Sequence, residues 1–209
     1  PEGFRPASNW GAMETNGLFH IAALFPELRP AAEWLALARR RCTELYAAQV
    51  YPDGVQMELT PGYHGVTLSN LLGILETARR NGIELPPDFV TGLESMFEVY
   101  AAVAMPDGRY PALNDSGWGR VAGALAPAVA LFPERTDFAW FASGGKVGAP
   151  PERTSWQLPY AGWNVMRSGW GPEDGYLLFE TGPYGAGHQH EDQLNLILHT
   201  GGKTLLTEG

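Results

Sequence analysis

Residues 143–159 read SGGKVGAPPERTSWQLP, a stretch rich in glycine, proline and polar side chains that is typical of a linker. Apolar residues before it recur at helical spacing, whereas those after it lie in short apolar or alternating runs. A run of helices followed by a run of strands indicates an α domain and then a β domain. We therefore expect an α+β chain with a helical domain at 1–142, a linker at 143–160 and a β domain at 161–209.

The helical half is predicted to consist of hairpins. Helical periodicity predicts helices at Met13–Phe25, Ala31–Val50, Tyr63–Asn81, Asp88–Ala104 and Trp118–Leu131. Pro-Asp-Gly loops recur between them at 52–54 and 106–108, which favours stacked helical hairpins over a compact bundle. In the second half, strands are expected at Gly162–Arg167, Tyr176–Glu180, Leu194–Thr200 and Lys203–Thr207.

Composition limits the classes of function. The chain has 209 residues, of which 44% are hydrophobic, so it can bury a substantial core. Its net charge of −9 disfavours nucleic acid and anionic membranes as partners, and an anionic substrate would have to be held by local cations. No apolar run reaches the roughly 18 residues that span a bilayer. The single cysteine, Cys42, excludes an intrachain disulfide and a cysteine-based zinc site.

The segment at 182–193, GPYGAGHQHEDQ, combines two histidines, two carboxylates and three glycines. Such groups are unfavourable in a core without partners, so this pattern points to metal binding or proton transfer. The alternative is a polar loop whose histidines face solvent. If the segment is extended, His188 and His190 project to the same side, whereas a turn would separate them. Glu208 ends the last strand and is placed to approach His190 across a hairpin.

Two motifs in the helical half carry further candidates. Asn9 lies at a helix start, where it either caps the helix or presents an amide to a carboxylate or developing oxyanion. Tyr63 and His64 follow Thr-Pro-Gly at the mouth of another helix. Tyr63 can act as an acid, or as a base if a nearby positive group lowers its pKa from about 10. The alternative is an aromatic side chain that covers the core beside a solvated histidine.

Five motifs, taken in order, resemble the heparinase II/III-like polysaccharide lyases, and the resemblance covers nearly the whole chain. They are Asn9-Trp10 with Glu14, then MELTPGYH at 57–64, VMRSGW at 165–170, GHQHED at 187–192 and LLTEG at 205–209. The resemblance implies an incomplete α/α toroid followed by an antiparallel β-sandwich, here its beginning only, with the active cleft between them. Because the chain stops directly after a strand, we read it as a truncated fragment.

The resemblance also implies roles for individual residues. Asn9 would neutralise a uronate carboxylate, Tyr63 and His188 would be the acid/base pair, and His64 would assist the tyrosine. His190 would match a zinc ligand, with Glu208 where the family commonly has an aspartate and a third ligand expected beyond residue 209. Zinc would be structural, and no organic cofactor is expected. Candidate substrate contacts are Trp10, Glu14, Glu58, Arg167 and Tyr184.

The implied reaction is β-elimination on a uronic-acid polymer, heparan-sulfate-type or alginate-type, by a periplasmic or secreted enzyme. With only 14 lysines and arginines, a weakly sulfated chain is favoured over dense heparin. Two alternatives stay open. One is a glycoside hydrolase that uses carboxylates such as Glu14, Glu58 or Asp115. The other is a non-catalytic carbohydrate-binding relative.

Overall fold

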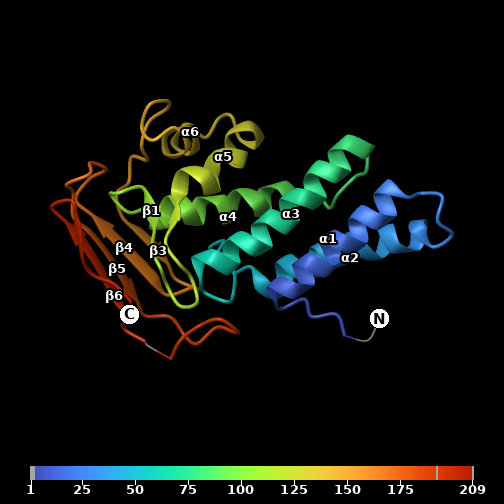
Figure 1. Cartoon of the computed structure of the whole chain (residues 1–209), viewed down its shortest axis with the longest axis horizontal. Coiled ribbons are helices and arrows are strands. Elements are labelled where there is room, and N and C mark those ends of the chain that lie inside the picture. The colour runs from blue at the N-terminus through green and yellow to red at the C-terminus, as the bar shows by residue number, and fades with distance from the viewer. Residues whose placement is uncertain (1–2, 192, 209) are drawn as a thin grey trace.

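The computed structural model describes residues 3–191 and 193–208 and shows a helical region followed by an antiparallel sheet (Figure 1). The helices are α1 (Asn9–Leu24), α2 (Ala31–Gln49), α3 (Pro61–Asn81), α4 (Phe89–Val103), α5 (Val121–Leu131) and α6 (Thr136–Ala142). The strands are β1 (Arg109–Tyr110), β2 (Gly119–Arg120), β3 (Trp156–Leu158), β4 (Trp163–Arg167), β5 (Tyr176–Glu180), β6 (Leu196–Thr200) and β7 (Lys203–Leu206). The predicted fold class, helical hairpins and then an antiparallel sheet, is confirmed.

The helix ends follow local chemistry. α1 begins four residues earlier than its periodicity predicts, because the Ser8 hydroxyl caps it by accepting from the Trp10 amide at 3.2 Å. α3 ends at Gly82, whose φ of 64° lets the chain leave the helix in the left-handed conformation. The seven-residue α6 was not predicted, since it is too short to show a period. β3 lies inside the predicted linker.

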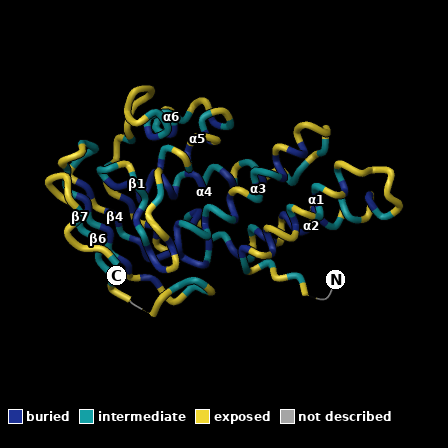
Figure 2. The backbone as a smooth tube through the Cα atoms, in the orientation of Figure 1, coloured by how far each residue is buried: buried dark blue, intermediate teal, exposed yellow. Residues whose placement is uncertain are grey.

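Strands β3 to β7 form one antiparallel sheet in sequential order, and one face of it packs on the helical region. Alternation along the strands places apolar side chains on that face, among them Trp163, Val165, Tyr176, Leu178 and Ile197, where they share a core with residues at the end of α4. A separate core lies between the helices. Figure 2 shows that buried backbone runs through α3, α4 and the facing strands.

Hydrogen bonds fix the sheet to the helical region at both ends of β4. The Arg167 guanidinium donates to the carbonyls of Ala104, at 2.7 Å and 3.1 Å, and of Ala102, which are free at the end of α4. Beyond the other end, the Asp53 carboxylate accepts from the Tyr160 and Ala161 amides at 2.8 Å and 3.0 Å. These contacts set the position of the β-domain loops over the helices.

Candidate active site

Asn9 is held by a buried carboxylate rather than free in a loop. Its side-chain amide donates to both oxygens of Glu58, at 3.1 Å and 3.0 Å, and its backbone amide donates to Glu58 Oε1 at 3.2 Å. Both residues are 3% exposed. Three charge-assisted hydrogen bonds therefore fix the orientation of the Asn9 amide.

Tyr63 and His188 come from different domains and lie ring on ring. Tyr63 stands in the first turn of α3, and His188 lies in the loop between β5 and β6. Their ring centroids are 3.4 Å apart with planes inclined by 7°. Among the hydrogen bonds of the described chain, none engages the Tyr63 hydroxyl or His188 Nε2. Both atoms are thus free to exchange protons with a ligand.

Asp115 binds both histidines of the 182–193 segment. Its carboxylate lies 3.0 Å from His188 Nδ1 and 3.0 Å from His190 Nε2. These hydrogen bonds, to His190 first and then to His188, lower the pKa of the Asp115 carboxyl. A proton on His188 Nδ1 directed at Asp115 leaves the lone pair on Nε2. The segment is a loop rather than a strand, yet its histidines converge on one carboxylate.

His190 lies between two carboxylates, those of Asp115 and Glu208. His190 Nδ1 lies 2.7 Å from Glu208 Oε1, so both ring nitrogens face carboxylates. The hydrogen bond to Asp115 is the largest contribution that raises the pKa of His190, and the Glu208 charge adds to it. Because only an imidazolium can donate from both nitrogens, this geometry favours the charged form.

Asn114 links the two halves of the site. Its side chain donates to the Leu59 carbonyl at 2.8 Å and accepts from the His190 amide at 2.7 Å, while its own amide donates to Glu208 at 2.8 Å. Its φ is 57°, a left-handed conformation that asparagine tolerates better than most residues. Sequence reasoning missed Asn114 and considered Asp115 only as a hydrolase carboxylate. Their one signal was the polar run Asn-Asp-Ser-Gly at 114–117.

Two glycines let the histidine loop lie against the helical domain. A Cβ on Gly185 would be 2.2 Å from the Met57 carbonyl oxygen, so only glycine permits this approach. Gly187 has a φ of 62°, a left-handed conformation that favours glycine, and it lies next to Glu58. The loop that carries His188 therefore lies close to Met57 and Glu58, the segment that holds Asn9. Asp192, part of the same sequence motif, lies outside the described residues.

His64 is buried away from this group. Its Nδ1 accepts from the Gln56 amide at 3.3 Å and its Nε2 lies 2.9 Å from the Met96 carbonyl oxygen. Burial lowers its pKa to about 4. A neutral imidazole with both nitrogens engaged holds the segment before Tyr63 in place, and it has no free nitrogen for the tyrosine.

The expected substrate contacts lie in different places. Trp10 and Glu14 are exposed on α1, and Tyr184 is exposed on the histidine loop, beside a shallow hollow of about 290 Å³. Glu58 binds Asn9, as described above. Arg167 lies at the far end of β4, 8% exposed and bonded to carbonyls, which differs from the expectation of a substrate-binding group.

The expected zinc ligands lie together but do not make a complete site. His190 and Glu208 are in contact, and Glu208 also accepts from the Asn114 and Asn195 amides. Within residues 3–191 and 193–208, no group of three or more His, Cys, Asp or Glu side chains has the arrangement to hold a metal ion. Structural zinc takes four ligands, so the described residues alone do not fit it. Zinc stays a prediction, to be checked by metal analysis of the purified protein.

A helical region, an antiparallel sheet and a polar site between them agree with the expectation of a heparinase II/III-like protein. The family profile described as "Heparinase II/III N-terminus" matches residues 2–140, and "Heparinase II/III-like, C-terminal" matches residues 150–209. The chain belongs to this family.

Individual members of the family are similar to this chain in sequence and in structure. The chain is 28% identical to the heparin-sulfate lyase of Bacteroides stercoris, over 93% of this chain and 30% of the relative. It is 30% identical to that of Pedobacter heparinus, over 80% and 26%. A solved heparinase III gene product superposes with a TM-score of 0.86 at 27% identity, over 98% of this chain and 33% of the other. The heparan sulfate lyase HepC of Pedobacter heparinus gives 0.82 at 26% identity, over 93% and 31%. The chain thus spans about a third of these relatives or less.

Proposed function

We propose that this chain carries the catalytic site of a polysaccharide lyase that cleaves a uronic-acid polymer by β-elimination. The observation that carries the proposal is the contact between Tyr63 and His188 beside the Asn9–Glu58 pair. We infer that this amide, phenol and imidazole act on one sugar at the domain junction. Such a set matches the needs of proton abstraction next to a carboxylate.

The chemistry follows from the charge that develops. Removal of the C5 proton places a carbanion beside the uronate carboxylate, and electrons then move to expel the C4 oxygen and leave a C4–C5 double bond. One N–H of the Asn9 side chain, shared between the two Glu58 oxygens, accounts for both contacts, and the second N–H donates to the uronate carboxylate and offsets part of the added charge. Glu58 keeps the Asn9 amide in the orientation this requires.

Tyr63 and His188 divide the two proton transfers. His188 Nε2 can accept the C5 proton while Nδ1 remains on Asp115, and the Tyr63 hydroxyl can donate to the departing oxygen. For the opposite stereochemistry at C5 the proton lies on the other face of the ring, and the two roles exchange. The proposal therefore assigns the pair and leaves the order to the substrate. His64 acts as a positioning residue.

The substrate is proposed to be a heparan-sulfate-type chain. The relatives above are named heparin-sulfate or heparan sulfate lyases, which supports this choice over alginate. The net charge of −9 favours a weakly sulfated polymer.

Among the described residues, no helix is long and apolar enough to cross a bilayer. We expect the enzyme to work where such polymers occur, in the periplasm or outside the cell.

A substrate panel tests the proposal. Heparan sulfate, hyaluronan, chondroitin and alginate are digested with the full-length protein, and the ultraviolet absorbance of new double bonds is recorded. Tyr63→Phe is expected to lower turnover by about 10² to 10⁴, the usual contribution of a positioned acid or base. Tyr160→Phe is the matched control, since Tyr160 is exposed on the turn after β3.

Each alternative has a distinct result. A glycoside hydrolase would release reducing ends without new double bonds, and a non-catalytic relative would bind the polymer without shortening it. Full turnover in Tyr63→Phe would overturn the assignment of the tyrosine.

A further inference from the structure

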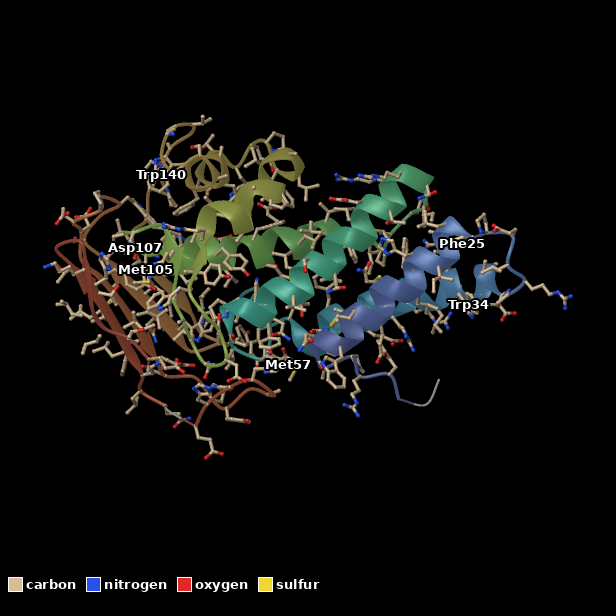
Figure 3. All side chains as sticks on the ribbon, viewed as in Figure 1. Phe25, Trp34, Met57, Met105, Asp107 and Trp140 are labelled. Carbon is tan, nitrogen blue, oxygen red and sulfur yellow. The ribbon has the colours of Figure 1, made fainter. Side chains whose placement is uncertain are left out.

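A cavity of about 450 Å³ lies on the other side of the molecule from the candidate active site, where α5 and α6 meet the sheet. Figure 3 shows three of its lining residues, Met105, Asp107 and Trp140, near α6 and the sheet, well apart from Met57 of the active-site segment. Its rim includes the exposed residues Gly108 and Arg120, so the cavity opens to solvent. Its volume is that of a ligand-binding pocket.

Positive charge dominates the lining. The buried Arg167 guanidinium donates from all three of its nitrogens to backbone carbonyls, so it contributes positive charge to the cavity. The exposed Arg120 donates from Nη1 to the Asp107 carbonyl. Within the described part of the chain, neither arginine pairs with a carboxylate. The acidic lining residue, Asp107, is already paired with Arg109 at 2.6 Å. In a chain of net charge −9, two arginines without acidic partners make this cavity suited to an anion.

Aromatic rings supply the rest of the lining. The Trp140 and Trp170 rings lie 5.9 Å apart between centroids and are inclined by 71°. The Trp170 indole N–H donates to the Pro151 carbonyl, which fixes that ring. Gly145 faces Trp140 without a side chain: a Cβ there would be 3.5 Å from the indole nitrogen. Flat apolar rings beside arginines match a pyranose ring, which has apolar C–H faces and, in a uronate or sulfated sugar, an anionic substituent.

We propose that this cavity is a second binding site, for an acidic sugar ring, separate from the catalytic group. Arg120 donates to the anionic substituent, the charge of Arg167 adds to the attraction without a direct hydrogen bond, and Trp140 packs on the ring. The identity of the sugar as part of the substrate polymer rests on the proposed function, whereas the preference for an anionic ring rests on the lining alone. Such a site holds the polymer on the protein at a distance from the cleavage point.

Site-resolved binding tests the proposal. The protein is labelled with 5-fluorotryptophan, its ¹⁹F signals are assigned by single Trp→Phe variants, and it carries Tyr63→Phe so that no ligand is consumed. It is titrated with three disaccharides: one that contains glucuronate, its sulfated form and a neutral analogue. We expect the Trp140 and Trp170 signals to shift with the acidic disaccharides. The signal of Trp34, which lies near the start of α2 and far from the cavity, is expected to stay unchanged. The two acidic ligands show whether carboxylate or sulfate is preferred.

Arg120→Gln is expected to weaken this binding about tenfold, the effect of one lost charge-assisted hydrogen bond. Arg80→Gln is the matched control, because Arg80 is exposed at the end of α3. Trp140→Phe gives a second variant and retains a ring in the core. Equal shifts with the neutral disaccharide, or unchanged affinity in both cavity variants, would overturn the proposal. Double-bond formation is measured separately on protein with Tyr63 intact. If that protein is an active lyase but no disaccharide binds in the cavity, only this inference is refuted and the proposed function stands.

Discussion

Glu58→Gln tests whether the orientation of Asn9 depends on the buried carboxylate. Glutamine keeps the size of the side chain and one acceptor oxygen. Its amide group would face the Asn9 side-chain amide, which is now 3.0 Å from Glu58 Oε2, and two donors would then oppose each other. Asn9 must turn away or lose a hydrogen bond, so the variant disturbs the amide without creating a cavity.

The size of the effect follows from the bonds that are lost. A buried hydrogen bond to a charged group contributes roughly 1.5 to 3 kcal/mol. If Asn9 acts on the uronate in the transition state, loss of its orientation lowers kcat/KM by roughly tenfold to a hundredfold. The same loss lowers the free energy of unfolding by roughly 1 to 3 kcal/mol, since both residues are buried.

A double-mutant cycle with Asn9→Ala separates an indirect role from a direct one. Initial rates of double-bond formation and urea unfolding are measured for the wild type, both single variants and the pair. If Glu58 acts through Asn9, Glu58→Gln has little further effect on kcat/KM once Asn9 is alanine. An undiminished effect in the Asn9→Ala background would refute the reasoning and assign Glu58 a role of its own.

Three further predictions concern single contacts. Because the pKa of His64 is about 4 when folded and near 6.5 when unfolded, the unfolded chain binds the proton first, and stability falls by roughly 3 kcal/mol between pH 6.5 and pH 4. Urea unfolding across this range should show a shallower fall in His64→Gln, and an equal fall would contradict the assignment. Arg167→Lys loses the forked hydrogen bonds to α4, so urea unfolding is expected to show a loss of about 3 kcal/mol, and an unchanged value would contradict the anchoring role. Gly185→Ala places a Cβ against the Met57 carbonyl, so kcat/KM should fall while the thermal midpoint stays unchanged; full activity would show that the loop position does not matter.

Most of the fold can be predicted because its long elements have strong local signals. α2 begins at Ala31 as predicted, and β5 has both predicted ends, Tyr176 and Glu180, since apolar spacing and turn residues agree there. β3 was missed because Trp156–Leu158 stands among prolines and polar residues, and only its pairing with β4 makes it a strand. Short elements take their structure from tertiary contacts that sequence does not display.

The candidate site divides in the same way. Tyr63, His188 and Asn9 come from recognisable motifs, and their contacts are consistent with the roles expected for them. Asp115 and Asn114 were not expected there, because their importance lies in contacts with residues more than seventy positions away in sequence. For Arg167 the motif suggested a substrate contact that the structure does not show. Its guanidinium instead bonds carbonyls at the end of α4 and so joins the sheet to the helical region.

The histidine loop rests on the helical domain through hydrogen bonds to Asn114 and Asp115 and through glycine contacts, not through the apolar core. Side chains that point away from these contacts can therefore be exchanged with little change in the apolar packing, whereas Gly182 and Gly185 must be kept. Protein engineers can therefore vary the exposed Pro183 and Tyr184 while they leave the glycines and the asparagine–aspartate support intact.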